Sequence, residues 1–269
     1  MQNKKAVDFT SGPIVKPLLL FSIPMFVANI LQQMYNITDS IIVGQLLGAN
    51  ALASIGSSSA IINLSISIAI GMTLGVAVTV SQFFGAQDMV NVKKAVSTCY
   101  LFFILVGVAI SILGLIFSQK LLELVKTPPQ IFSDALSYLR ITFVGTTLMI
   151  GYNVANAIYR GLGNSRLPLI FLIISTALNI ILDLIFVVFF NLGVKGTALA
   201  TIISQAISFI LSFSYYQKNY SSIKLSLSSF NFDFHLLKKI LKIGVPSGIK
   251  GGMYWGGFVV ITSLINSYG

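Results

Sequence analysis

The sequence is poor in charge, in histidine and in cysteine. Asp, Glu, Lys and Arg make up 9% of its 269 residues, against roughly 25% in an ordinary soluble domain. With one cysteine, Cys99, and one histidine, His235, it can form no internal disulfide and no metal site built from several such ligands. The sequence contains no nucleophile–base pair and no phosphate-binding loop, so we expect neither enzymatic catalysis nor a bound cofactor.

Apolar residues are correspondingly abundant in the sequence. They account for 55% of the residues, and the mean hydropathy is +0.90. A soluble chain of this length could not hide so much apolar surface from water, so part of it must face lipid. The net charge is +10, but Lys and Arg lie in short gaps between apolar runs. This distribution predicts contact with the headgroups of a lipid bilayer and no binding of nucleic acid.

Seven apolar runs are long enough to cross a bilayer as helices, which takes ~20 residues each. All are far longer than the ~10-residue alternating segments of a membrane β-barrel. We therefore predict an all-α polytopic membrane helix bundle, with a six-helix lobe and a seventh transmembrane helix. The predicted spans are 17–43, 53–80, 95–117, 136–158, 167–190, 194–215 and 243–266.

The order of the segments predicts three parts. Residues 1–216 form the N-terminal six-helix lobe, 217–242 a serine- and lysine-containing linker, and 243–269 the first helix of an incomplete second lobe. The segment around Pro246 weakly echoes the segment around Pro24, and internal repeats are a common design in transporters. We therefore expect a half-length or truncated member of a two-lobe class, which would need a second lobe or another copy of the chain as a partner.

The positions of Lys and Arg predict the orientation. If the N-terminus is inside, twelve of these residues lie in inner segments and four in outer ones, while Lys250 lies within a run. Because Lys and Arg are enriched in cytoplasmic loops, we predict a cytoplasmic N-terminus and a cytoplasmic 217–242 linker. We expect the protein to be a multi-pass component of the plasma membrane.

Two carboxylates, Asp39 and Asp183, lie inside apolar runs. A buried carboxylate is costly unless it is protonated, paired or bound to a cation. At ~1.5 Å per helical residue, Asp39 lies ~33 Å along the first helix and Asp183 ~24 Å along the fifth. Asn179 lies one turn from Asp183, and Thr201 reaches the same outer half on the sixth helix. The oxygen atoms of these four side chains suit Na⁺ or a shared proton.

Simpler explanations remain open at each of these positions. Asp39 could lie in water at the outer interface, and Asn179 and Thr201 could only bond neighbouring helices. Pro24 and Pro246 could be gating hinges or static bends. The remaining small residues in the runs predict close helix packing; they are Ser57 to Ser59, Gly71, Gly75 and Gly107.

The same segments resemble a known family, the multidrug and toxic compound extrusion (MATE) transporters. The similar stretches occur in order across nearly the whole chain. Each stretch alone is a weak match to the family, but together the stretches are a specific match. They are IP at 23–24, TDSIIVGQLLGANALAS at 38–54, GMTLGVAVTVSQFFGAQD at 71–88, YRGLGNSRLPL at 159–169, NIILDLIFV at 179–187, LGVKGTALATIISQ at 192–205 and IGVPSGIKGG at 243–252.

The resemblance implies export of drugs or other small organic molecules, often cationic, by antiport with H⁺ or Na⁺. In the family's N-terminal lobe, the cation-coupling residues match Asp39, Asn179, Asp183 and Thr201 of this chain. A further family asparagine, on the fourth helix, matches Asn156. Depth along the helix puts Asn156 near the inner end, apart from the other four.

Two alternatives stay open at this point. The first is a lipid-linked oligosaccharide flippase of the same broader superfamily. Such flippases tend to carry cationic residues facing the central cavity, whereas only Lys250 lies within a membrane run here. The second is a membrane fragment that folds but transports nothing, which the missing second lobe favours. The sequence does not distinguish H⁺ from Na⁺, or one substrate from another.

Overall fold

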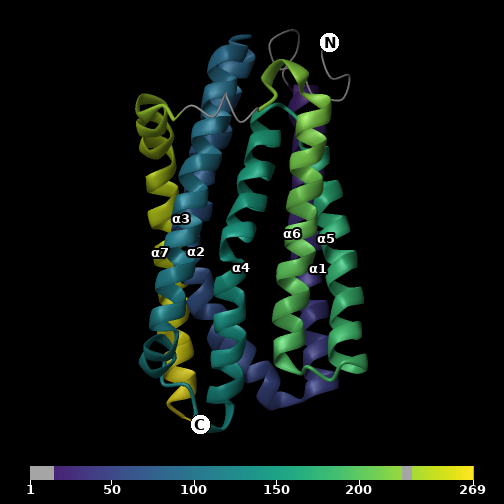
Figure 1. Ribbon diagram of the computed structural model, residues 1–269, viewed down its shortest axis with the longest axis vertical. Helices are drawn as coiled ribbons and strands as arrows, with labels where there is room; N and C mark the ends of the chain where they lie inside the picture. The colour runs from purple at the N-terminus through teal and green to yellow at the C-terminus, as the bar shows by residue number, and fades with distance from the viewer. Residues whose placement is uncertain (1–14, 226–231, 269) are drawn as a thin grey trace.

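A computed structural model describes residues 15–225 and 232–268, and within these ranges the chain forms seven α-helices (Figure 1). A π-helical segment η1, Ile185–Phe189, continues α5, and a short 3₁₀ turn η2, Ser221–Ile223, follows α6. The α-helices are α1 Val15–Leu47, α2 Ala49–Gly85, α3 Met89–Leu124, α4 Pro129–Gly161, α5 Arg166–Leu184, α6 Val194–Asn219 and α7 Phe234–Asn266.

The predicted helix bundle is confirmed. In the described residues, six helices are long and apolar enough to cross a membrane: α1, α2, α3, α4, α5 with η1, and α6. The seventh predicted span forms α7, which has 33 residues but is not among these six. The end at which α7 begins carries Lys238, Lys239 and Lys242, so this helix starts in a polar region before it enters its apolar stretch.

Two helices, α3 and α7, begin before the predicted apolar runs, each at a polar capping residue. The Asp88 carboxylate accepts a hydrogen bond of 3.1 Å from the Asn91 backbone N–H and so caps α3. This bond lowers the pKa of the Asp88 carboxyl below its ordinary value. Asp233 caps α7 in the same way, accepting from the Leu236 N–H at 3.1 Å. Both caps satisfy backbone donors that a helix leaves unpaired at its start.

The predicted 217–242 linker is partly helical in the structure. Helix α6 continues to Asn219, and α7 begins at Phe234, nine residues before the predicted seventh span. The middle of the linker, 226–231, and the predicted cytoplasmic N-terminal tail, 1–14, lie outside the described residues.

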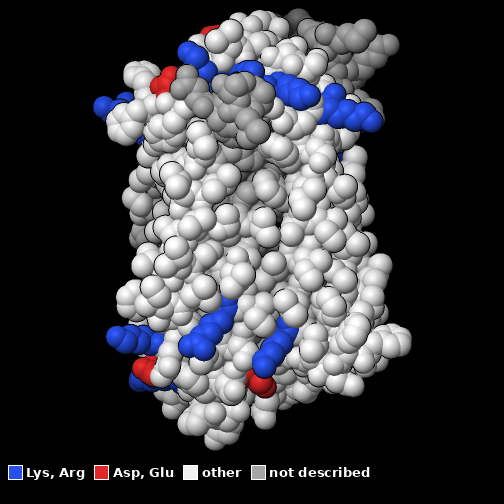
Figure 2. Space-filling model, viewed as in Figure 1, with Lys and Arg blue, Asp and Glu red and all other residues white. Residues whose placement is uncertain are grey.

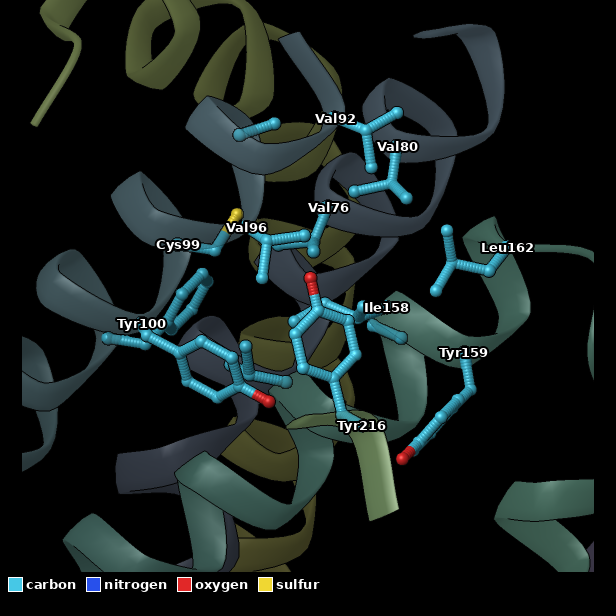
Figure 3. Packing of buried hydrophobic residues seen from close by; sticks show 14 of the residues in the cluster. Val76, Val80, Val92, Val96, Cys99, Tyr100, Ile158, Tyr159, Leu162 and Tyr216 are labelled. Carbon is cyan, nitrogen blue, oxygen red and sulfur yellow. The ribbon is translucent and has the colours of Figure 1, made fainter. Parts of the chain in front are cut away.

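Helix α4 lies between two groups of helices (Figure 1). On one side α2 packs against α3 and α7, and on the other α5 packs against α1 and α6. Buried side chains of α2, α3, α4 and α6 fill the half of the bundle in which α1 begins, among them Val76, Val96, Ile158 and Tyr216 (Figure 3). A second cluster around Phe143 fills the opposite half.

Charged side chains are confined to the two ends of the bundle, with an uncharged band between them on the face that Figure 2 shows. The end at which α1 begins is the more basic: Lys16, Lys93, Lys94, Arg160, Arg166, Lys218, Lys224, Lys238, Lys239 and Lys242 belong to helix ends and connections there. An apolar band between two charged rims is the surface expected of a membrane-spanning bundle.

The small residues predicted to pack between helices do so. A Cβ built on Gly107 of α3 would lie 2.8 Å from the Thr147 Cα of α4, and one on Gly71 would lie 2.4 Å from the Gly248 Cα of α7. Ser58 of α2 donates a 3.0 Å hydrogen bond to the Ala135 carbonyl oxygen of α4. Backbones approach this closely in membranes where side chains are small.

Candidate cation site

Helix α5 presents two polar side chains on one buried face. Asn179 and Asp183 are one turn apart, and their exposed fractions are 1% and 0%. Directly after Asp183, the helix continues as the π-helical segment Ile185–Phe189. Such segments within α-helices are often found at functional sites. Here the segment extends α5 for one more turn beyond the buried carboxylate.

Helix α1 brings a second carboxylate to the same place. The Asp39 and Asp183 side chains lie within hydrogen-bonding reach of each other. Three of their four carboxylate oxygens, Asp39 Oδ1 and Asp183 Oδ1 and Oδ2, are buried and accept no hydrogen bond from a described residue. Two carboxylates can only accept, so a hydrogen bond between them requires that one of them holds a proton. A bound cation would satisfy the same oxygens.

Helix α6 completes the group with a hydroxyl. The Asn179 side-chain amide donates a hydrogen bond of 3.4 Å to Thr201 Oγ1. The amide oxygen of Asn179 is buried and has no partner among the described residues. The structure thus brings Asp39, Asn179, Asp183 and Thr201 together from three helices, with oxygen atoms still free to bind. Their role in coupling stays a prediction.

Two tyrosines that the sequence did not single out belong to the same neighbourhood. Tyr35, one turn before Asp39 on α1, forms a side-chain hydrogen bond with Thr201. Tyr138 of α4 lies near both carboxylates and bonds the Ser59 side chain of α2. Tyrosine is common in membrane helices for reasons of packing and interface anchoring, so its presence in an apolar run gave no distinct signal. The spacing of four between Tyr35 and Asp39 is the feature that could have identified it.

Asn156, by contrast, lies apart from this group. It is on α4, five residues before the end of the helix at Gly161 and close to Tyr152. Asp39 and Thr201 lie toward the opposite end of the bundle, near the end of α1 and the start of α6. Within the described residues, no recorded interaction joins Asn156 to Asp39, Asn179, Asp183 or Thr201.

The chemistry of the group is that of a small hard cation. Carboxylate, amide and hydroxyl oxygens are the ligands of protons and of alkali or alkaline-earth ions, whereas transition metals prefer Cys and His. No cluster of three or more His, Cys, Asp or Glu occurs in the part of the chain that the structure describes. The group therefore offers a place where an H⁺ or Na⁺ could bind between α1, α5 and α6.

The comparisons with known proteins agree with this fold. The MatE family model matches residues 24–185. The chain is 34% identical to the probable multidrug resistance protein YpnP of Bacillus subtilis (strain 168), over 98% of this chain and 59% of the relative. It is 23% identical to the multidrug export protein MepA of Staphylococcus aureus (strain NCTC 8325 / PS 47), over 100% of this chain and 60% of that relative.

Two solved structures of a multidrug resistance MATE family transporter of the MOP superfamily are similar to the chain. The outward-facing conformation has a TM-score of 0.85 at 26% identity and covers 93% of this chain and 56% of the solved one. The inward-facing conformation has a TM-score of 0.77 at 26% identity, with coverages of 86% and 56%. The chain thus spans less than two thirds of the length of these relatives. It belongs to the MATE family of membrane transporters.

Proposed function

We propose that this chain carries the cation-coupling site of an antiporter that exports drugs or other small organic molecules in exchange for H⁺ or Na⁺. The observation that carries the proposal is the pair Asp39 and Asp183, because three of their four carboxylate oxygens are buried and lack donors among the described residues. Membership of a family whose relatives are named for multidrug resistance and export supports the cargo class.

The carboxylate pair gives the coupling a physical basis. Two adjacent carboxylates in a medium of low dielectric repel each other strongly when both are ionised. A proton shared between Asp39 and Asp183, or a Na⁺ held with Asn179 and Thr201, removes that repulsion. Loading and release of the cation therefore change the attraction between α1 and α5, the two helices that carry the carboxylates. Movement of α1 relative to α5 would link the cation to the substrate path.

Cation binding can be measured on this chain without any transport assay. Purified protein in lipid nanodiscs is incubated with radiolabelled Na⁺ over a range of pH, and proton release on Na⁺ addition is followed with a pH-sensitive dye. We expect Na⁺ binding that releases protons, or proton uptake alone if the site takes only H⁺. A chain in which Asp39→Asn and Asp183→Asn together alter neither Na⁺ binding nor proton uptake would refute the site.

We further propose that the protein lies in the plasma membrane with its N-terminus in the cytoplasm. The basic end of the bundle supports this orientation, because Lys and Arg are enriched on the cytoplasmic side. Single cysteines at Ser221 and Gln119, both exposed, can be probed on intact cells with an impermeant thiol reagent, in a chain that lacks Cys99. We expect labelling at Gln119 only. Labelling at Ser221 with none at Gln119 would reverse the orientation.

A further inference from the structure

Helix α6 carries a line of hydroxyl groups that leads from the candidate cation site toward the basic end of the bundle. Thr201, Ser204, Ser208 and Ser212 follow one another at spacings of three or four residues, so they lie on one face of the helix. The three serines are almost completely buried, with exposed fractions of 1%, 0% and 0%. Thr201 belongs to the candidate site itself, where it accepts a hydrogen bond from Asn179. We call these four hydroxyl residues the hydroxyl stripe.

The hydroxyl stripe faces α5, which packs beside α6 (Figure 1). The bond between Asn179 and Thr201 shows which residues of the two helices are level, because consecutive helices joined by a short turn run in opposite directions. Counting eleven residues from each member of this bonded pair, away from the cation site, leads to Pro168 on α5 and Ser212 on α6. Pro168 lies in the first turn of α5, which begins at Arg166. The stripe thus extends from the cation site to the basic end of the bundle.

Two hydroxyls of the stripe have no hydrogen-bond partner among the described residues: Ser208 Oγ and Ser212 Oγ. A serine within a helix commonly donates to a backbone carbonyl three or four residues earlier. Ser204 does so at 2.9 Å, and so does Ser54 of α2 at 2.8 Å. Close packing alone therefore does not explain Ser208 and Ser212, because a serine that only packs between helices can still make this bond.

Water molecules fit the spacing of these groups. A buried hydroxyl without a partner is costly, and buried water binds where such polar groups occur. Side chains four residues apart lie ~6 Å apart along a helix axis, and a water molecule that bonds both of them at ~2.8 Å spans that distance. One water between Ser204 and Ser208 and another between Ser208 and Ser212 would join the three hydroxyls into a continuous chain.

Tyr35 connects the carboxylate pair with the first hydroxyl of the stripe. It lies one turn before Asp39 on α1, and its hydroxyl forms a hydrogen bond with the Thr201 side chain. A hydroxyl both donates and accepts, so it can pass a proton on, whereas an amide such as that of Asn179 keeps its protons. A continuous series of hydroxyls thus leads from Asp39 through Tyr35 and Thr201 to the serines of α6.

We propose that bound water molecules along the hydroxyl stripe form the path by which a proton leaves the Asp39–Asp183 pair toward the basic end of the bundle. The inference rests on the proposed function, because it takes that pair as the group that holds the proton. The protonated carboxyl gives its proton to the first oxygen of the chain. Each oxygen then accepts one proton and passes one on, and the last water delivers a proton to the solvent. Only O–H bonds break and form, and the pair is left with one more negative charge.

The accessibility of single cysteines to Ag⁺ tests for water along the stripe. Ser208→Cys and Ser212→Cys are made in a chain that lacks Cys99, and the purified proteins in lipid nanodiscs are exposed to Ag⁺ in a chloride-free buffer. Thiols that Ag⁺ has not blocked are then counted with a maleimide after unfolding in detergent. Ser54→Cys is the matched control, because Ser54 is also 0% exposed but bonds a carbonyl of its own helix.

We expect Ag⁺ to block Ser208→Cys and Ser212→Cys about tenfold faster than Ser54→Cys, since a thiol reacts as its thiolate, which needs water, and a dry buried thiol is inert. Equally slow reaction of all three cysteines would show that the stripe is dry and would overturn the proposal.

Proton release from the basic end alone tests the path itself. Proteoliposomes that hold one molecule each are captured through an N-terminal tag. This selects molecules whose basic end faces the outer buffer, because α1 begins at that end. The outer pH is then raised, and a pH-sensitive dye in the buffer follows the released protons. The signal of the Asp39→Asn/Asp183→Asn variant is subtracted, so that only protons from the carboxylate pair are counted.

We expect Ser208→Ala/Ser212→Ala to release the same number of protons about tenfold more slowly, because the methyl groups bind no water and roughly one hydrogen-bonded step is lost. Ser54→Ala should release them at the wild-type rate. An unchanged rate in the double serine variant would refute the path while leaving the carboxylate site in place. A wild type that releases no proton from the pair would instead refute the proposed function, and the path with it, even if Ag⁺ finds water along the stripe.

Discussion

The helices on the two sides of α4 differ in the interactions that hold them together. On the α2–α7 side, the two backbones pack against each other, and a methyl group added at Gly71, Gly75 or Gly244 would collide with the neighbouring helix. On the α1–α5–α6 side, two carboxylates carry three buried oxygens that no described residue satisfies. The first side is held together by close packing of the two helices, which does not depend on pH. The second side carries two carboxylates whose mutual repulsion a proton or a bound cation would remove.

The packing of α1 sharpens the contrast. Val43 is its only buried residue, whereas α2 buries residues from Ala51 to Val80. A helix with few buried contacts can shift at small cost. Asp39, one of the two carboxylates that we propose to bind the cation, is therefore carried by the α-helix with the fewest buried residues in this chain. Predictions that separate stability from coupling can break or sharpen this comparison.

The largest expected effect is that of Asp183→Asn. The amide keeps the side-chain shape but removes the charge that a cation must balance, so we expect cation-driven efflux to be abolished in a two-lobe protein. Expression and thermal stability should stay near those of the wild type, since the change relieves an uncompensated buried charge. The measurement is substrate efflux from proteoliposomes, with H⁺ and Na⁺ gradients applied separately. Wild-type coupling in this variant would show that the role of Asp183 is structural and that it does not bind the coupling cation.

Asp39→Asn should abolish coupling to the same degree. Because both carboxylates hold one shared cation, the double variant Asp39→Asn/Asp183→Asn should be little worse than either single one, and their effects should not add. Efflux rates of the three variants in the same proteoliposome assay give the comparison. Additive losses would mean that the two carboxylates bind separate cations.

On the α2–α7 side, Gly71→Ala should lower stability and leave the cation site intact. The added methyl group would lie 2.4 Å from the Gly248 Cα, and overpacking of this kind typically costs about 1–3 kcal/mol. The matched control is Gly256→Ala, where a Cβ meets nothing within 4 Å. Thermal unfolding in detergent should show a lower midpoint for Gly71→Ala only. Equal midpoints for the two variants would contradict the close approach of α2 and α7 at Gly71.

Thr201→Ala should weaken the site without abolishing coupling. The hydroxyl accepts a hydrogen bond from Asn179 and supplies one neutral oxygen, so its loss removes one ligand among several. We expect Na⁺ affinity to fall about tenfold, corresponding to one hydrogen-bonding contact to a charged group. Titration of radiolabelled Na⁺ onto the purified chain measures this. A loss as complete as that of Asp183→Asn would give Thr201 a larger role than geometry indicates.

The smallest effect is expected at Asn156. Sequence resemblance assigns this residue to the cation site, but its position on α4 separates it from the carboxylate pair. Asn156→Ala should therefore change Na⁺ affinity less than Thr201→Ala in the same titration. A greater loss at Asn156 would show that the side chain reaches the site in another conformation of the transporter.

The sequence predicted the helices well and their contacts only in part. Apolar runs identify the portions of helix within hydrocarbon, but not the turns beyond it, so α7 begins at Phe234 and not near residue 243. The beginning of that helix follows from Asp233, a capping residue that lies outside any apolar run. The π-helical turn after Asp183 has no distinctive composition and could not be predicted.

The candidate site, too, could be predicted from the sequence only in part. Asp39 and Asp183 could be found because an ionisable residue in an apolar run is unusual, and helix depth placed both in one half of the bundle. Tyr138 could not be found, because its proximity to them depends on how α4 rotates against α1 and α5. Likewise, Gly71 and Gly75 indicated close packing, but only the fold shows that their partner is α7.

If Asp39 and Asp183 couple transport as we propose, their shared position also limits how much work one transport cycle can do. A pair that takes up one monovalent cation per cycle gains about 1.4 kcal/mol for each tenfold gradient of that cation. If the exported molecule carries one positive charge, the exchange moves no net charge, and the membrane voltage contributes nothing. A neutral cargo would instead gain about 2.3 kcal/mol per 100 mV. The charge of the cargo thus decides whether accumulation follows the ion gradient alone or the voltage as well.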